Sequence, residues 1–291
     1  NILGVIRRRP GRLYGVNLVK KHVHFMGIAG SGMSAVAAIA AFQGYQISGC
    51  DLDPNSEYLK DLREELKFEF YQGHDVHHLR NVDILTITPA VTSLDPDNPE
   101  IAEARKKKIP ILSWQEFMGQ YLHRDKFVIA VAGTHGKSTT TAMIGLILER
   151  AGFDPTVEVG ATVPQWGRNF RVGKGKYFVC EADEFNDNFL NYHPDVAVIT
   201  NIEFDHPEYF KNLTSVKKSF NKFVENLKPG GLLIQDYKLP KDLKLQIPGE
   251  FNRQNAALVW KVASRLGIGS EIIRQALTSF TGIGRRFELK G

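Results

Sequence analysis

The sequence predicts an α/β protein made of two consecutive units, each a doubly wound sheet flanked by helices. Three observations lead to this fold class. Short apolar segments alternate with helical segments along the chain. A glycine-containing turn follows the first strand-like segment of each unit, at 27–32 and at 133–136. Polar clusters follow several strand-like segments, and open α/β sheets bind ligands at those strand ends. A chain of 291 residues is also too long for one ordinary domain.

The first unit is predicted to cover residues 22–122. An Ala-rich helix opened by glycines follows its first strand, and the segment WQEFMGQYL after its last strand has helical character. The β–α alternation predicts a doubly wound sheet. The expected strands are HVHFMG (22–27), QISGCDLD (46–53), VDILTITPA (82–90) and KIPILS (108–113).

The second unit is predicted to cover residues 123–281. Continuous apolar strands of this kind are typical of a buried parallel sheet. The expected strands are FVIAVAG (127–133), KYFVCEADE (176–184) and DVAVITNIEFDH (195–206). The expected helices are STTTAMIGLILERAGF after the first strand, then 215–227, 252–267 and 271–280.

Composition narrows the class of protein. With 43% hydrophobic and 24% charged residues, the chain is typical of a soluble globular protein. No apolar run is long enough for a membrane span and no signal peptide is visible, so a cytoplasmic location without membrane insertion is expected. Cys50 and Cys180 are interpreted as buried free thiols of a reducing compartment.

Residues 1–21 form a basic N-terminal arm. It carries part of the net charge of +5, in the segment RRRPGR. Neither an aromatic platform nor a recognised binding motif accompanies these arginines, so a solvated tail is favoured over nucleic-acid binding.

The segment AVAGTHGKSTTT at 130–141 predicts a phosphate-binding loop. A buried strand, a glycine turn and a helix N-terminus together place unpaired backbone N–H groups and the positive end of the helix dipole at one point. Lys137 is expected to reach the β- and γ-phosphates, and the Ser138 hydroxyl to hold Mg²⁺. The predicted ATP-binding residues of this loop are Gly133, Thr134, His135, Gly136, Lys137, Ser138 and Thr139.

Two further groups of residues follow strand ends. Glu181, Asp183 and Glu184 lie in one acidic cluster, from which Glu181 is expected to supply the second Mg²⁺ ligand. His206 ends the next strand and is expected to coordinate another cation.

A second glycine-rich turn lies in the first unit. Gly27, Gly30 and Gly32 have GxxGxG spacing, and Asp51 ends the next strand, where it can accept from a ribose or a base. Such a turn binds a diphosphate, which leaves a nicotinamide dehydrogenase open as an alternative for this unit. The histidines of GHDVHHLRN are not favoured as a zinc site, because no further ligand follows nearby; His74 is expected to make a polar contact instead.

Taken in order, these motifs resemble those of the Mur ligases of peptidoglycan synthesis. The resemblance covers residues 22–291. GTxGK[ST] alone would also fit folylpolyglutamate synthase and the cyanophycin synthetases, but the whole series is more specific. The motifs are GIAGSGMS, GHDVHHLRNVDILTITPAV, DNPEI, GTHGKSTTT, EADEFNDNFL, TNIEFDHPEYF, PGEFNRQNAA and GIGRRFE.

The resemblance implies three domains: a Rossmann-like UDP-sugar domain, a central P-loop-type ATPase domain with a parallel sheet, and a C-terminal amino-acid domain. Residues 282–291 look like the junction to the third domain, which is expected to be absent, so this chain alone is expected to bind nucleotides without ligating. The segment 230–251 is shorter than is usual in the family, Phe251 stands where His is frequent, and Ser138 replaces the commoner Thr.

The resemblance also implies roles for individual residues. Lys137, Glu181 and His206 would be catalytic, with metal ligands Ser138, Glu181 and His206. Asn252, Asn255 and Arg285 would join the phosphate loop in binding ATP. The UDP-sugar contacts would be Gly30, Ser31, Gly32, Met33, Asp51 and His74.

Within the family, the motifs are most similar to those of the ligase that joins L-alanine to UDP-N-acetylmuramate. That reaction uses ATP and Mg²⁺ and passes through an acyl phosphate. A ligase that joins a tripeptide to the same UDP-sugar, a folylpolyglutamate synthase and a binding-only module remain alternatives. The oligomeric state is left open.

Overall fold

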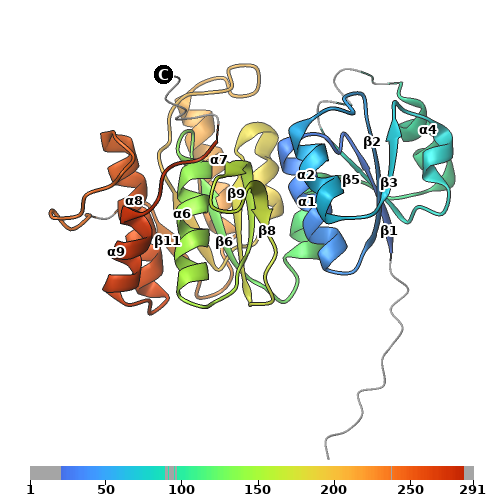
Figure 1. Ribbon diagram of the computed structural model, residues 1–291. Coiled ribbons are helices and arrows are strands. Elements are labelled where there is room, and N and C mark those ends of the chain that lie inside the picture. The colour runs from blue at the N-terminus through green and yellow to red at the C-terminus, as the bar shows by residue number, and fades with distance from the viewer. Residues whose placement is uncertain (1–20, 89–90, 92–94, 96, 237, 285–291) are drawn as a thin grey trace, which may run out of the picture.

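The computed structural model describes residues 21–88, 91, 95, 97–236 and 238–284. It contains two sheets side by side, each covered by helices (Figure 1). The α/β class predicted from the sequence is confirmed. The basic arm up to residue 20 lies outside the described residues, as do residues 285–291 of the predicted junction, including Arg285.

The first sheet has five strands in the order β3-β2-β1-β4-β5, and all neighbours are parallel. Four strands were predicted; β3 was not, because its four residues are partly exposed and lack an apolar run. The strands are β1 (His22–Met26), β2 (Gln46–Asp51), β3 (Glu69–Gln72), β4 (Ile84–Ile87) and β5 (Ile111–Ser113). The helical elements are α1 (Ser31–Phe42), α2 (Glu57–Glu65), the 3-10 turn η1 (Val76–Leu79), α4 (Pro99–Lys107), α5 (Trp114–Phe117) and the π-helical turn η2 (Met118–Leu122).

The second sheet has six strands in the order β11-β10-β6-β9-β7-β8. The predicted parallel pairing is confirmed for β11 through β7, while β8 pairs antiparallel with β7, so the sheet is mixed. The sequence analysis did not predict β7, β8 or β11. The strands are β6 (Phe127–Ala132), β7 (Thr156–Val163), β8 (Arg168–Arg171), β9 (Tyr177–Ala182), β10 (Val196–Ile199) and β11 (Leu232–Ile234).

Helices cover both faces of the second sheet. Buried side chains of α6, α8 and α9 form one apolar cluster with the strands, and α7 with the 3-10 turn η3 packs on the other face. The helical elements are α6 (Lys137–Arg150), η3 (Phe185–Asn191), α7 (Leu213–Glu225), α8 (Glu250–Arg265) and α9 (Ser270–Thr278).

Contacts between the two sheet units bring their ligand-binding edges together. Helix α1 packs against β7 and β8. Asn169 Nδ2 donates to the Ser31 carbonyl (2.5 Å), and Arg168 pairs with Glu65 (2.6 Å). One cluster of buried apolar residues runs from the first sheet through α1 and η2 to the second sheet. None of the helices in the described ranges is long and apolar enough to cross a bilayer.

Candidate functional site

The phosphate loop connects β6 to α6. Strand β6 is almost wholly buried, and α6 begins at Lys137, directly after Gly136. Gly136 has φ 87°, a left-handed conformation that glycine adopts without the strain of a Cβ. The first turn of α6 therefore presents its N–H groups and the positive end of its dipole at the end of a buried strand. The strand, glycine turn and helix predicted here from the sequence are present, and their use as an anion site stays a prediction.

The loop is braced by the segment that follows β10. The Thr200 hydroxyl donates to the His135 carbonyl (2.5 Å), and the Asn201 amide both donates to that carbonyl and accepts from the His135 N–H. The Glu203 N–H donates to the Thr134 hydroxyl (2.9 Å). These bonds fix the loop backbone at Thr134 and His135 to the segment that follows β10.

Asn255 of α8 lies directly against the loop. A Cβ placed on Gly136 would come within 2.6 Å of its Oδ1, so the side-chain amide lies against the backbone of the turn. Asn252, one turn earlier, donates to the Pro248 carbonyl and is buried, as Asn255 is. The structure thus brings Asn255 to the predicted ATP site, while Asn252 secures the start of α8.

Lys137 makes a buried ion pair. Its Nζ lies 2.9 Å from Glu184 Oε2 and donates to the Gly133 carbonyl (2.7 Å). Burial raises the pKa of Glu184, although the ammonium of Lys137 opposes that rise. Glu184 Oε1 is buried and has no hydrogen-bond partner among the described residues. The carboxylate therefore holds the lysine in place and keeps one acceptor unused.

In the acidic cluster, Asp183 and Glu184 lie beside Lys137 of the loop, whereas the sequence analysis predicted Glu181 as the magnesium ligand. Ligand atoms of Asp183, Glu184 and His206 lie within 4.8 Å of one another, and Asp183 Oδ1 lies 3.9 Å from Lys137 Nζ. The ring of His206 lies beside Phe185, with 4.8 Å between centroids. Of the three predicted metal ligands, His206 belongs to this group and Glu181 does not. Ser138 directly follows Lys137 in the first turn of α6.

Glu181 faces β7 instead. Its Oε1 accepts from the Gly160 N–H (2.5 Å), and its own N–H donates to Glu158 Oε2 (3.1 Å). Burial, together with the charge of Glu181, raises the pKa of Glu158 well above its usual value. The sequence analysis missed Glu158, because β7 was not predicted. Its one signal was a single acid within the apolar segment TVEVGATV.

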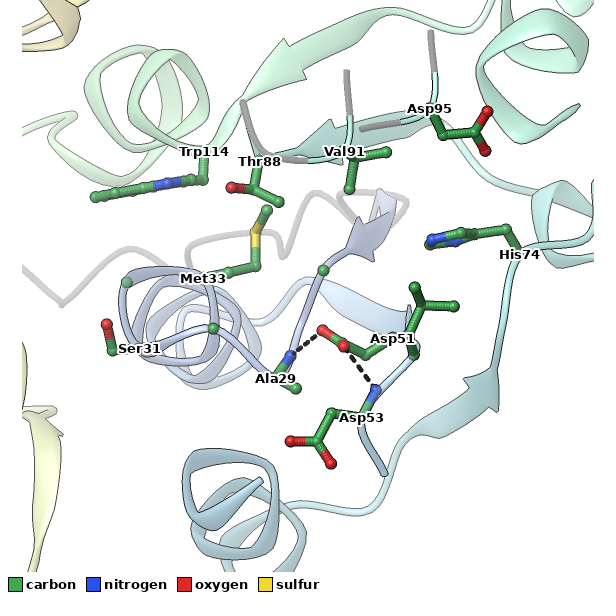
Figure 2. A pocket seen from close by; sticks show the side chains of 14 residues that line it. Ala29, Ser31, Met33, Asp51, Asp53, His74, Thr88, Val91, Asp95 and Trp114 are labelled. Atoms are coloured by element: carbon green, nitrogen blue, oxygen red, sulfur yellow. Dashed lines mark hydrogen bonds between the residues drawn. The ribbon is translucent and has the colours of Figure 1, made fainter. Parts of the chain in front are cut away.

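The glycine turn of the first unit lines a cavity of about 710 Å³ (Figure 2). All six predicted sugar-nucleotide residues line it. Trp114 was missed, although it directly follows β5 and its ring lies against Gly32. The lining residues include Gly27, Gly30, Ser31, Gly32, Met33, Asp51, His74, Thr88, Asp95 and Trp114.

Asp51 braces this turn. Its Oδ2 accepts from the Ala29 N–H (2.8 Å) and its Oδ1 from the Asp53 N–H (3.0 Å), as Figure 2 shows. The Gly27 N–H donates to the Cys50 carbonyl (2.8 Å) in the same turn. Asp51 thus shapes the loop, and His74 lies at the end of the cavity opposite Trp114 (Figure 2).

A second cavity joins the two loops. It has a volume of about 560 Å³, and Ala29, Gly30 and Ser31 line it together with Ser138 of α6. The same three residues of the glycine turn line the first cavity. The predicted sugar-nucleotide turn and the predicted ATP loop therefore face a common space between the two sheets.

Sequence comparison assigns this arrangement to a family. The model of the Mur ligase family, catalytic domain, matches residues 22–126, and that of the Mur ligase middle domain matches residues 131–240. A two-sheet α/β fold with an ATP loop beside a glycine-rich turn agrees with both matches. The chain belongs to the Mur ligase family.

Two curated relatives show which members of the family the chain resembles in sequence. The chain is 37% identical to the UDP-N-acetylmuramate–L-alanine ligase of Caldicellulosiruptor bescii over 92% of its own length and 68% of the relative. It is 34% identical to the enzyme of the same name from Acetivibrio thermocellus, over 93% of this chain and 67% of that one. The chain thus spans about two thirds of the relatives' length.

Solved structures agree with the fold. The UDP-N-acetylmuramate-alanine ligase MurC of Thermotoga maritima superposes with a TM-score of 0.81 at 28% identity, over 93% of this chain and 71% of that chain. The UDP-N-acetylmuramate:L-alanyl-gamma-D-glutamyl-meso-diaminopimelate ligase (MPL) from Neisseria meningitides gives 0.80 at 25% identity, over 91% and 99%.

Proposed function

We propose that this chain carries the nucleotide-binding part of an ATP-dependent ligase that joins L-alanine to UDP-N-acetylmuramate through an acyl phosphate. The observation that carries the proposal is the common space between Ser31 and Ser138. If the diphosphate of the UDP-sugar is bound at the glycine turn, its sugar would lie toward the ATP loop. The two reactants of a phosphoryl transfer would then meet at the first turn of α6.

The residues of the ATP loop suit that transfer. The α6 N-terminus and Lys137 would bind the β- and γ-phosphates, where negative charge is concentrated. Positioning and charge neutralisation supply most of the catalysis in phosphoryl transfer. On binding ATP, Lys137 would exchange its contact with Glu184 for one with the phosphates, so the pair keeps the lysine oriented until the nucleotide arrives.

The carboxylates beside Lys137 fit a magnesium ion. Mg²⁺ prefers oxygen ligands and is usually held by one or two carboxylates with substrate phosphates. Glu184 supplies an unpartnered buried oxygen, and Asp183 and His206 supply further ligand atoms within reach. Bound there, Mg²⁺ would neutralise charge on the transferring phosphate. The alternative set from the sequence, Ser138 with Glu181 and His206, remains a proposal of the same kind.

A tripeptide is the second candidate for the amine substrate. The likeness to the MPL structure favours it, because this chain covers 99% of that structure. The curated relatives named for L-alanine are more similar in sequence, at 34–37% identity. L-alanine is therefore the first candidate.

Trapping the acyl phosphate tests the proposal. The chain is incubated with MgATP, UDP-N-acetylmuramate and hydroxylamine, which converts an acyl phosphate to a stable hydroxamate. We expect hydroxamate and ADP in equal amounts, both dependent on the UDP-sugar and both lost in Lys137→Met. A parallel titration compares the UDP-sugar with NAD⁺. Binding of NAD⁺ without the UDP-sugar would overturn the proposal, and so would ADP release that does not depend on the UDP-sugar.

Amine selectivity is then measured on a protein that also carries the amino-acid domain which the family resemblance implies, with L-alanine or the tripeptide in place of hydroxylamine. Faster ADP release with L-alanine supports the first candidate, and faster release with the tripeptide supports the second.

A further inference from the structure

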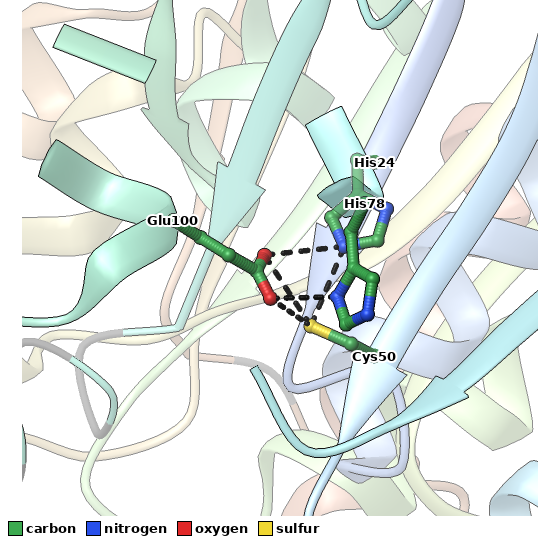
Figure 3. Close-up of side chains that lie close together, drawn as sticks. All are labelled: His24, Cys50, His78 and Glu100. Carbon is green, nitrogen blue, oxygen red and sulfur yellow. Dashed lines mark hydrogen bonds and ion pairs between the residues drawn. The ribbon is translucent and has the colours of Figure 1, made fainter. Parts of the chain in front are cut away.

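Four side chains of types that ligate metals lie close together in the first unit, near the cavity lined by the glycine turn. Figure 3 shows His24 of β1, Cys50 of β2, His78 of η1 and Glu100 of α4 pointing toward one another. One ligand atom from each lies within 4.8 Å of the others. His24, Cys50 and Glu100 are fully buried. Neither the ATP loop nor the common space between the sheets involves this cluster.

Hydrogen bonds determine which nitrogen of His24 carries its proton. The Asn81 carbonyl can only accept, so His22 Nδ1, at 3.0 Å, must donate to it. In a neutral His22, Nε2 then accepts from the Ser48 hydroxyl (2.8 Å). That hydroxyl is left to accept from His24 Nδ1–H at 2.8 Å. In neutral His24, Nε2 is therefore a bare acceptor that points into the cluster.

Two acceptors then face each other in a buried place. His24 Nε2 lies 3.4 Å from Glu100 Oε2. Glu100 Oε1 is supplied with donors, because the Asp75 N–H lies at 2.9 Å and His78 Nδ1 at 2.8 Å. The Cys50 thiol has one proton for these two acceptors. Its Sγ lies 3.6 Å from Glu100 Oε2 and 3.3 Å from His24 Nε2.

A buried acceptor without a donor costs free energy, and a cation between the two would remove that cost.

The spacing of the ligand atoms suits a tetrahedral ion. Bonds of about 2.0–2.3 Å to nitrogen, oxygen and sulfur give ligand–ligand edges of about 3.3–3.6 Å in a tetrahedron. The corresponding edges are 3.3 Å for His24–Cys50, 3.4 Å for His24–Glu100 and 3.6 Å for Cys50–Glu100 Oε2. His78 offers a ring nitrogen within 4.8 Å of the other ligand atoms, and its Nδ1 would leave Glu100 Oε1 (2.8 Å) to complete the set.

We infer that these four side chains form a closed Zn²⁺ site with His24 Nε2, Cys50 Sγ, His78 Nδ1 and Glu100 Oε2 as ligands. Two imidazoles, a thiolate and a carboxylate are the donor types that Zn²⁺ takes in proteins. On binding, the Cys50 thiol proton leaves to solvent. His78 gives up the Nδ1 proton that it donates to Glu100 Oε1 and takes up one from solvent on Nε2, so that Nδ1 can ligate.

Outer contacts complete the site. Ser48 accepts from His24 Nδ1–H and so fixes the ring that ligates, and the Asp75 N–H holds the other oxygen of Glu100. The ion would tie together β1, β2, η1 and α4. The Cys50 carbonyl also accepts from the Gly27 N–H, so the ion would lie directly behind the glycine turn. Its role is structural, because all four positions are filled by the protein.

Metal titration of the whole chain tests the inference without any nucleotide. The protein is stripped with a chelator and titrated with ZnCl₂, and in parallel with CoCl₂. We expect one Zn²⁺ per chain to survive gel filtration, a rise in the temperature of unfolding, and a thiolate-to-cobalt charge-transfer band. Cys50→Ser should lose the band and the retained zinc. Ser48→Ala should weaken zinc binding about 10–100-fold.

Cys180→Ser is the matched control, because Cys180 is also a buried free thiol but belongs to β9 of the other unit. It should bind both metals as the unmodified chain does. Absence of both stoichiometric zinc and the cobalt band in the unmodified chain would overturn the inference and leave a hydrogen-bonded network. Retention of the band in Cys50→Ser, or its loss in Cys180→Ser, would overturn it as well.

Discussion

Replacing Lys137 by Met tests the ion pair at the centre of the ATP loop. The side chain of Lys137 is 16% exposed and that of Glu184 only 2%, so the methionine leaves a carboxylate buried without its cation. Removing one partner of a buried pair costs about 3–5 kcal/mol. Glu184 can escape part of that cost by taking up a proton, because burial already raises its pKa. We therefore expect a loss of about 2–3 kcal/mol at neutral pH.

The pH dependence of that loss follows from the sign of the shift. An acid whose pKa is raised in the folded state stabilises the fold below its unfolded pKa, and this contribution is lost as pH rises through the folded pKa. Without Lys137 the pKa of Glu184 rises further. The loss in Lys137→Met should therefore be small near about pH 5 and larger near about pH 8.

Urea unfolding at both pH values measures the effect, and MgATP titration follows binding separately. The matched variant is Lys137→Met with Glu184→Gln, which removes the buried charge and keeps the shape. It should regain most of the stability and none of the MgATP binding. A loss below about 1 kcal/mol with no pH dependence would refute the buried pair, since exposed pairs are worth that little. Failure of Glu184→Gln to restore stability would refute it too.

Three further changes test other parts of the site. Gly136→Ala places a Cβ within 2.6 Å of Asn255 Oδ1 at a residue with φ 87°, so MgATP affinity measured by calorimetry should fall about tenfold or more. Unchanged affinity would contradict the close approach of Asn255 to the loop backbone. Asp51→Ala removes the acceptor of the Ala29 N–H, so UDP-sugar binding should weaken about tenfold while MgATP binding stays the same; an equal fall in both would indicate a general loss of structure. Glu158→Gln removes an acid whose raised pKa makes the fold less stable as pH rises above about 4.5. The stability of this variant, measured by urea unfolding, should therefore decline less with rising pH than that of the unmodified chain, and parallel profiles would show that Glu158 carries no such cost.

The sequence alone determined the two glycine turns and the strands that precede them. A continuous apolar run such as FVIAVA predicts a buried strand from its own composition. When a glycine ends the run and a helical pattern follows, only a few local structures are compatible with the segment. These features depend on neighbours along the chain. Sequence patterns therefore predicted the loop at 133–138 and the turn at 27–32 with their positions in the fold. The strands β3, β7, β8 and β11 escaped prediction because they are short or interrupted by polar residues.

Only the tertiary structure decided which acids meet which partners. Glu181, Asp183 and Glu184 stand within four positions of one another, and the sequence cannot tell them apart. In the fold, Glu181 is still part of β9 and its side chain turns to β7, whereas Glu184 lies past the strand end and reaches Lys137. The cluster around Cys50 depends on the register that pairs it with Met26, two residues beyond His24, and on a helix that brings in Glu100 from far along the chain. These contacts between distant segments depend on strand order and register. Both result from packing of the whole sheet, so they leave no local pattern in the sequence.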